Sequence, residues 1–191
     1  MKALGHLKTV LIHKYFVGKY CFMCGLYWQG IIHDLSKFSP TEFIESCKYY
    51  TGDRSPIDNC KDKNGYSYCW FHHRGRNYHH WEMWVDNFER GITRHKIPFK
   101  YTLEMMCDFL AAGRAYNGKD FTIDNEYEWW LKKRQVALIN RNTLMFMDVL
   151  FWAMKNHGIK NVLKDRMYIG RLKWLYENEP EQLAEYSPFE Y

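Results

Sequence analysis

The segment IIHDLSK, residues 31–37, ends an apolar run with a histidine and an aspartate side by side. An imidazole beside a carboxylate offers two ligands to one metal ion. Further potential ligands flank the pair, because His13 lies upstream and Asp108 lies in a later apolar stretch. Between them comes a histidine cluster made of His72, His73, His79 and His80. This order predicts a buried metal site that several helices assemble.

Each of these residues has an ordinary explanation when it is taken alone. His13 on an amphipathic helix can be a packed or surface histidine, and Asp108 can be a cap or a hydrogen-bonded core group. A buried Asp or His without a partner costs free energy, so several on apolar helix faces favour one shared partner. The ordered set therefore points to a metal ion more strongly than any single member does.

Apolar residues recur at helical spacing on both sides of the segment. A helix is expected over residues 6–24, with His13 on its inner face. A second helix is expected over residues 26–37, and it carries the pair His33-Asp34. Lys37 lies one helical turn beyond His33, so the two side chains should share a face.

A helix start follows at SPTE, residues 39–42, with serine as the N-cap, proline at the first helical position and Glu42 as the capping glutamate. This helix is expected to end near residue 50, and residues 51–69 predict a long loop. Further helices are expected over residues 78–90, 98–117, 124–138, 142–157 and 159–177. No alternation typical of strands is evident, so the predicted fold class is all-α.

Length and composition favour one well-packed domain. The 191 residues are expected to form a metal-site core over about 6–118, followed by helices over about 122–178. Hydrophobic residues make up 47% and aromatic residues 18%, which excludes a disordered chain. The net charge of +5 suits a small anionic substrate; nucleic acid is compatible with it but not indicated.

The sequence predicts a cytoplasmic protein without a membrane partner. Basic residues interrupt the apolar start of the chain, and no apolar run approaches the roughly 18 residues that a membrane span needs. The six cysteines are therefore expected to be reduced thiols. Cys21 and Cys24 form a CxxC with no second CxxC, which favours plain packing over zinc binding or redox chemistry.

The order of His13, His33, Asp34 and Asp108 resembles the ligand set of the HD superfamily, an all-helical fold of metal-dependent phosphohydrolases. HDLSK (33–37) is similar to the HD-x-x-K form of HD-GYP phosphodiesterases and HD-type diiron oxygenases, although the chain lacks the GYP element. The longer strings HDLSKFSPTEF (33–43), HHRGRNYHHWEMW (72–84) and EMMCDFLAAGRAYNGK (104–119) resemble an uncharacterised branch, catalogued as a domain of unknown function. The resemblance implies an HD-domain-like helical bundle with additional C-terminal helices.

The resemblance also implies a ligand set for one or two divalent transition ions, Mn, Fe, Co, Ni or Zn. The first ion would be held by His13, His33, Asp34 and Asp108. His73 and His80, on either side of the turn at residues 76–77, are the favoured ligands of a second ion that Asp34 bridges. His72 and His79 would then contact the substrate or support the ligands. One metal beside a histidine-rich substrate pocket is the alternative.

Other candidates surround these ligands. Lys37 is a catalytic candidate that would contact a phosphate or a bound oxygen species, unless it is a solvated lysine at a helix end. Glu82 is a candidate general acid or base. The candidates for substrate binding are His72, Arg74, Arg76, Asn77, His79 and Arg114. Trp70, Trp81 and Tyr116 either stack on a base or pack in the core.

The leading expectation is an enzyme, a metal-dependent phosphohydrolase for a nucleotide, cyclic nucleotide or other small phosphoester. The first alternative is an HD-type diiron oxygenase with the same ligand order. The second is a non-enzymatic domain in which the metal is structural, as four protein ligands without an open position would indicate. The number, identity and redox state of the bound ions distinguish the three.

Overall fold

The structure is a computed structural model that describes residues 2–191, with every side chain among them except that of Phe88. It is 75% helical and contains one small two-stranded sheet among the described residues, so the all-α class is confirmed. No helix in this part of the chain has the length and apolar character to span a membrane. The cytoplasmic location stays a prediction.

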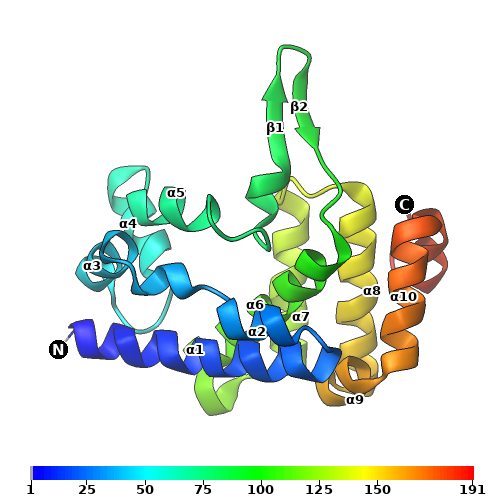
Figure 1. Cartoon of the computed structure of the whole chain (residues 1–191), viewed down its shortest axis with the longest axis horizontal. Helices are drawn as coiled ribbons and strands as arrows, with labels where there is room; N and C mark the ends of the chain where they lie inside the picture. Colours follow the sequence, from blue (N-terminus) through cyan, green and yellow to red (C-terminus); the bar gives the residue numbers. More distant parts are fainter. Residues whose placement is uncertain (1) are drawn as a thin grey trace.

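The long helix α1 (Lys2–Cys24) lies along the molecule and packs against α6 (Phe99–Asn117), while the short helix α2 (Tyr27–Ile32) lies on α1 (Figure 1). Near the N-terminal end of α1, three short helices pack together: α3 (Pro40–Tyr49), α4 (Pro56–Asn64) and α5 (Tyr68–Arg74). The opposite end contains α7 (Ile123–Val136), α8 (Arg141–His157), α9 (Ile159–Lys164) and α10 (Arg166–Asn178). A 3-10 helix (Pro180–Tyr186) packs on α8 and α10.

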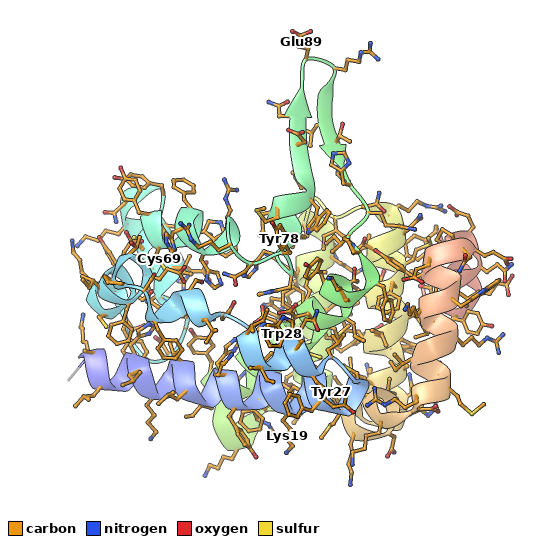
Figure 2. All side chains as sticks on the ribbon, in the orientation of Figure 1. Lys19, Tyr27, Trp28, Cys69, Tyr78 and Glu89 are labelled. Atoms are coloured by element: carbon orange, nitrogen blue, oxygen red, sulfur yellow. The ribbon has the colours of Figure 1, made fainter. Side chains whose placement is uncertain are left out.

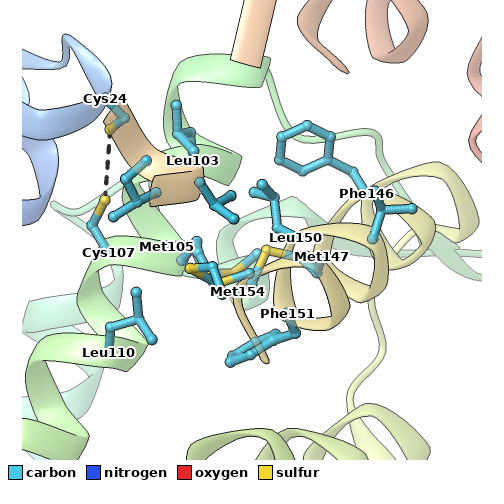
Figure 3. Close-up of a cluster of buried hydrophobic side chains, with 14 of the residues drawn as sticks. Cys24, Leu103, Met105, Cys107, Leu110, Phe146, Met147, Leu150, Phe151 and Met154 are labelled. Atoms are coloured by element: carbon cyan, nitrogen blue, oxygen red, sulfur yellow. Dashed lines mark hydrogen bonds between the residues drawn. The ribbon is translucent and has the colours of Figure 1, made fainter. Parts of the chain in front are cut away.

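The core lies where α6 meets α8 and the end of α1 (Figure 3). Leu103 and Leu110 on α6 and Leu150 on α8 are fully buried, and each contributes about 1.5–3 kcal/mol by leaving water. Cys24 Sγ lies 3.8 Å from Cys107 Sγ in this core. Both CxxC cysteines, Cys21 and Cys24, are buried and form no disulfide. This core fixes one face of α6, the helix that supplies Asp108.

The prediction of a helix over residues 78–90 is wrong. The chain instead forms a 3-10 helix (Trp81–Trp84) and an antiparallel hairpin of β1 (Val85–Phe88) and β2 (Gly91–Arg94). Gly91 has φ 111, a conformation that favours glycine, directly after the turn. The hairpin projects away from the body, with Glu89 at its tip (Figures 1 and 2). Aromatic and β-branched residues are favoured in strands, so the apolar residues of this segment did not distinguish a strand from a helix.

Two other boundaries differ from expectation. The predicted loop over residues 51–69 contains α4, which starts at Pro56 and ends at Asn64, before the left-handed C-cap Gly65 with φ 80. The helix predicted over residues 159–177 is interrupted at Asp165, whose side chain accepts a hydrogen bond from the Tyr168 N–H and starts α10. Both corrections come from capping signals within the segments.

Candidate metal centre

The helix expected over residues 26–37 ends early, at the His-Asp pair itself. α2 stops at Ile32, and Asp34 adopts the left-handed conformation with φ 52 and ψ 28. It is the one residue other than glycine with a positive φ among residues 2–191. The Lys14 ammonium on α1 donates hydrogen bonds to two carbonyl oxygens of this turn, over 2.5 and 2.6 Å. Aspartate tolerates this conformation better than most residues, and such strain is common at functional sites.

This turn brings consecutive side chains to one point, whereas on a continuous helix they would diverge by about 100°. Nε2 of His33 lies 3.3 Å from Oδ2 of Asp34 and 3.2 Å from Oδ1 of Asp108. Nε2 of His13 on α1 lies 3.6 Å and 3.1 Å from the same two oxygens. These four buried residues, from α1, the turn and α6, form the first cluster of potential metal ligands.

The second cluster consists of Asp34, His73, His79 and His80. Nε2 of His73 at the end of α5 lies 3.4 Å from Oδ1 of Asp34, and Nε2 of His79 lies 3.5 Å from that oxygen. The His80 ring is 4.8 Å from the His73 ring and 4.2 Å from the His79 ring, between centroids. The expected pair, His73 and His80, lies here, and His79 joins them as a further potential ligand.

The geometry fits metal ions. Ligands at about 2.0–2.2 Å from an ion are separated by roughly 3.0 Å in an octahedron and 3.4 Å in a tetrahedron. The four nitrogen–oxygen distances in the first cluster are 3.1–3.6 Å, and all its ligand atoms lie within 4.8 Å of one another. Within the described residues, several inward atoms are buried without a hydrogen-bond partner: His13 Nε2, Asp34 Oδ1, His79 Nε2 and His80 Nε2. Such orphaned polar atoms are costly, so both clusters could hold an ion.

Asp34 belongs to both clusters, because Oδ2 faces the first and Oδ1 the second. Burial would raise the pKa of Asp34, but His33 and Lys37 hold it well below its usual range, so the side chain shared by the two clusters is a carboxylate. Burial, followed by the nearby His79 and His73, lowers the pKa of His80 well below its usual value. A neutral imidazole is the form that binds a metal.

Outer carboxylates orient the histidines. Nδ1 of His33 donates to Oε1 of Glu104 over 2.8 Å, and Nδ1 of His79 lies 3.3 Å from the same oxygen. Nδ1 of His73 donates to Oε2 of Glu42 over 2.7 Å. In each case the ring turns Nε2 inward, the arrangement found around metal-bound histidines. Ser39 is the N-cap as expected, because its hydroxyl accepts from the Glu42 N–H. The Glu42 side chain is not the expected capping glutamate, because its two carboxylate oxygens bond His72 and His73 instead.

Lys37 shares a face with Asp34 rather than with His33. Residues Leu35–Phe38 form a 3-10 helix, in which side chains three positions apart align. The Lys37 ammonium lies 2.6 Å from Oδ2 of Asp34, and burial, which lowers its pKa, is outweighed by Asp34 and Asp108, which raise it. Lys37 is thus a half-buried lysine that is ion-paired at the clusters, and it is not a solvated lysine at a helix end.

The clusters open onto a pocket of about 170 Å³. Its wall includes potential ligands of both clusters, Lys37, and two of the aromatic candidates, Trp70 and Tyr116. Trp81, the third aromatic candidate, packs against the core instead. A site of this kind leaves room for a further ligand beside the protein groups.

Several candidates lie away from the pocket, as far as the described residues show. Glu82 is half-buried, its Oε2 atom is buried without a hydrogen-bond partner, and its charged neighbours are Lys133, Lys61 and Arg74. The Arg74 guanidinium stacks on Phe71. The other displaced candidates make contacts elsewhere: Arg76 donates to the His72 carbonyl, Arg114 stacks on Phe16 and Phe121, and Asn77 donates to Ser36 and the His73 carbonyl. His72 binds Oε1 of Glu42 over 2.6 Å.

Sequence reasoning missed two groups that the structure brings to the site. Glu104 lies four residues before Asp108, one helical turn away, and this spacing could have indicated it. His6 lies seven residues before His13, two turns along α1, and it lines the pocket. Both signals are weak alone, because they gain meaning only when Asp108 and His13 are known to point into one site.

The comparisons with known proteins give a family. A model of a family of unknown function, DUF5662, matches residues 2–164, and the chain belongs to this family. The match carries no assignment to the HD superfamily. No curated protein and no solved structure matches the chain.

Proposed function

We propose that this member of a family of unknown function is a metal-dependent phosphohydrolase that acts on a small phosphoester. One observation supports the proposal most: two ligand clusters that share Asp34 open onto a single pocket with Lys37 on its wall. A purely structural metal site is normally closed by its protein ligands. The ordered resemblance of His13, His33, Asp34 and Asp108 to the HD superfamily adds to this support.

The chain's own residues have clear tasks in such a reaction. His13, His33 and Asp108 would hold one divalent ion, and His73, His79 and His80 the other, with one oxygen of Asp34 for each. Bound ions of the Mn, Fe, Co, Ni or Zn type would polarise a phosphoryl oxygen and supply an acidified water. Lys37 would bind phosphoryl oxygens and stabilise their charge, while Glu104 and Glu42 keep the histidine rings turned inward.

The test is metal-dependent phosphate release. The protein is stripped with a chelator, reloaded separately with Mn²⁺, Co²⁺, Ni²⁺, Fe²⁺ or Zn²⁺, and assayed on a phosphoester panel in air and under argon. We expect phosphate release that needs the ion and is equal in both atmospheres. O₂ consumption with a mixed-valent diiron signal and no phosphate release would establish the oxygenase alternative. If bound ions support neither phosphate release nor O₂ consumption, the result would contradict both enzyme readings and favour a non-enzymatic domain with a structural metal.

A further inference from the structure

The outer face of α1 exposes a straight line of large apolar side chains. At these positions 46–75% of the residue's surface is exposed: Leu4, Leu11, Tyr15 and Phe22. Because a helix turns about 100° per residue, the four lie within about 20° of one line, which runs about 27 Å along the axis. His13, which faces the metal clusters, is on the opposite side of the helix. Contiguous exposed apolar surface of this kind marks an interaction site.

Aromatic side chains extend this apolar surface onto α2. The Phe22 and Tyr27 rings are 5.5 Å apart between centroids and meet edge to face. Tyr27 and Trp28 are 57% and 65% exposed at the start of α2 (Figure 2). Ile31, about one turn farther along α2, is exposed as well. Tyrosine and tryptophan combine an apolar body with a polar tip, so they suit a boundary between water and an apolar phase.

The charged side chains of α1 and α2 are all positive. Residues 2–33, which include both helices, contain four lysines and no aspartate or glutamate. Two of these lysines, Lys8 and Lys19, are exposed at about 40–60° from the apolar line. Arg166, exposed at the start of α10, donates to the Tyr27 hydroxyl over 3.2 Å. This surface therefore offers an anionic partner both apolar contacts and positive charge.

Charge complementarity selects the partner. In a symmetric dimer across this face, the lysines of one copy would meet the lysines of the other, because α1 carries no carboxylate to pair with them. An anionic bilayer offers its headgroups to the lysines and an apolar boundary to Leu4 and Leu11. A straight line of side chains also meets a flat surface along its whole length.

We propose that the protein binds the surface of an anionic lipid bilayer through this face of α1 and the adjoining aromatic residues of α2. The apolar side chains enter the boundary between headgroups and acyl chains, and Lys8 and Lys19 pair with the headgroups. The expectation of no membrane partner came from the lack of a spanning segment, whereas a surface contact requires only one apolar helix face. The contact does not depend on the proposed catalytic activity.

The first experiment measures binding to vesicles. The full chain is sedimented with vesicles of phosphatidylcholine alone or of phosphatidylcholine with about one third phosphatidylserine. We expect it to bind the anionic vesicles at least about tenfold more tightly than the neutral ones, and to be released by high salt. Equal affinity for both kinds of vesicle, or sedimentation with neither, would overturn the proposal. A dimer on gel filtration without vesicle binding would assign the face to a second copy instead.

The second experiment tests the apolar side chains. Leu11→Ser/Tyr15→Ser removes the middle of the exposed line, and Ile44→Ser/Ile92→Ser, at exposed positions on α3 and β2, is the matched control. We expect the first variant to bind anionic vesicles at least about tenfold more weakly than the wild type, and the control to change by less than about threefold. Equal binding by the two variants would show that the line does not enter the bilayer.

The third experiment reverses the charge of the lysines. Lys8→Glu/Lys19→Glu changes two charges beside the line, and Lys63→Glu/Lys132→Glu, at exposed positions on α4 and α7, changes the net charge by the same amount. We expect the first pair to weaken binding to anionic vesicles at least about tenfold and the second pair less than about threefold. Melting followed by circular dichroism checks that every variant folds. An equal loss in both pairs would mean that the net charge, rather than this face, attracts the protein to the vesicle, and would overturn the proposal.

Discussion

Nδ1 of His33 donates a hydrogen bond to Oε1 of Glu104 over 2.8 Å, and the same oxygen lies 3.3 Å from Nδ1 of His79. One carboxylate on α6 therefore orients a histidine from each cluster. Because both histidines would present Nε2 to the proposed ions, the affinities of the two ions should depend on the same side chain.

Glu104→Gln should weaken both metal sites together. The amide accepts more weakly than a carboxylate and can turn its NH₂ toward the rings, so we expect metal affinity to fall about 10- to 100-fold. Calorimetric titration with Mn²⁺ measures this. Glu128→Gln, an exposed change on α7, is the control. Loss at one site alone would show that Glu104 supports a single cluster.

Asp34→Ala should remove both ions, whereas His73→Ala should remove one. Each oxygen of Asp34 faces a different cluster, but His73 belongs only to the second. Elemental analysis after dialysis should give two ions per chain for the wild type and for the exposed control Asp124→Ala. Loss of metal should also lower the melting temperature, because binding to the folded state adds to its stability. A wild-type ratio of one ion would retire the two-metal proposal.

Lys37→Met should impair catalysis without loss of metal. The change keeps the aliphatic stem and removes the ammonium that lies 2.6 Å from Asp34 Oδ2. If the lysine meets the reacting phosphoryl group, kcat/KM should fall by the equivalent of about 2–4 kcal/mol. Lys160→Met, at an exposed position on α9, should leave kcat/KM unchanged. Unaltered turnover in Lys37→Met would assign the lysine to a purely structural ion pair.

Glu126 should make the protein less stable as the pH rises from about 5 to 7. Burial, with a smaller effect of Asp108, raises its pKa from 4.5 to about 7. The folded state then holds a proton that the unfolded state releases, so the wild type loses up to about 3 kcal/mol across this window. Glu126→Gln should lack this loss. Urea unfolding of the chelated proteins between pH 5 and 8 measures it, and parallel pH profiles would contradict the assignment.

Gly113→Ala should destabilise the fold although alanine favours helices. A Cβ at this position on α6 would overlap the Glu126 carboxylate and crowd Phe121. We expect a cost of about 1–3 kcal/mol in the free energy of unfolding. The control is Gly170→Ala on α10, where a Cβ meets open space and stability should rise by up to about 1 kcal/mol. Equal effects of the two changes would show that Glu126 moves aside freely.

The sequence alone determined the helical class and indicated most of the potential metal ligands that the structure brings together. Apolar periodicity predicted residues 98–117 as a helix, and the structure has α6 over Phe99–Asn117. Ser39 predicted the start of α3, because a cap and the proline after it act locally. The order of His13, His33-Asp34 and Asp108 was readable because a metal centre needs these side-chain types, whatever the distance between them in the chain.

Only the tertiary structure decided which of the remaining polar groups belong to the site. Glu104 and His6 join it because α1 and α6 pack together, whereas Glu82, beside the histidines in sequence, is turned toward Lys61 and Lys133. The left-handed turn at Asp34 likewise depends on Lys14, a distant residue on α1. Sequence spacing defines a face only within one helix, and the packing of helices then determines which faces meet.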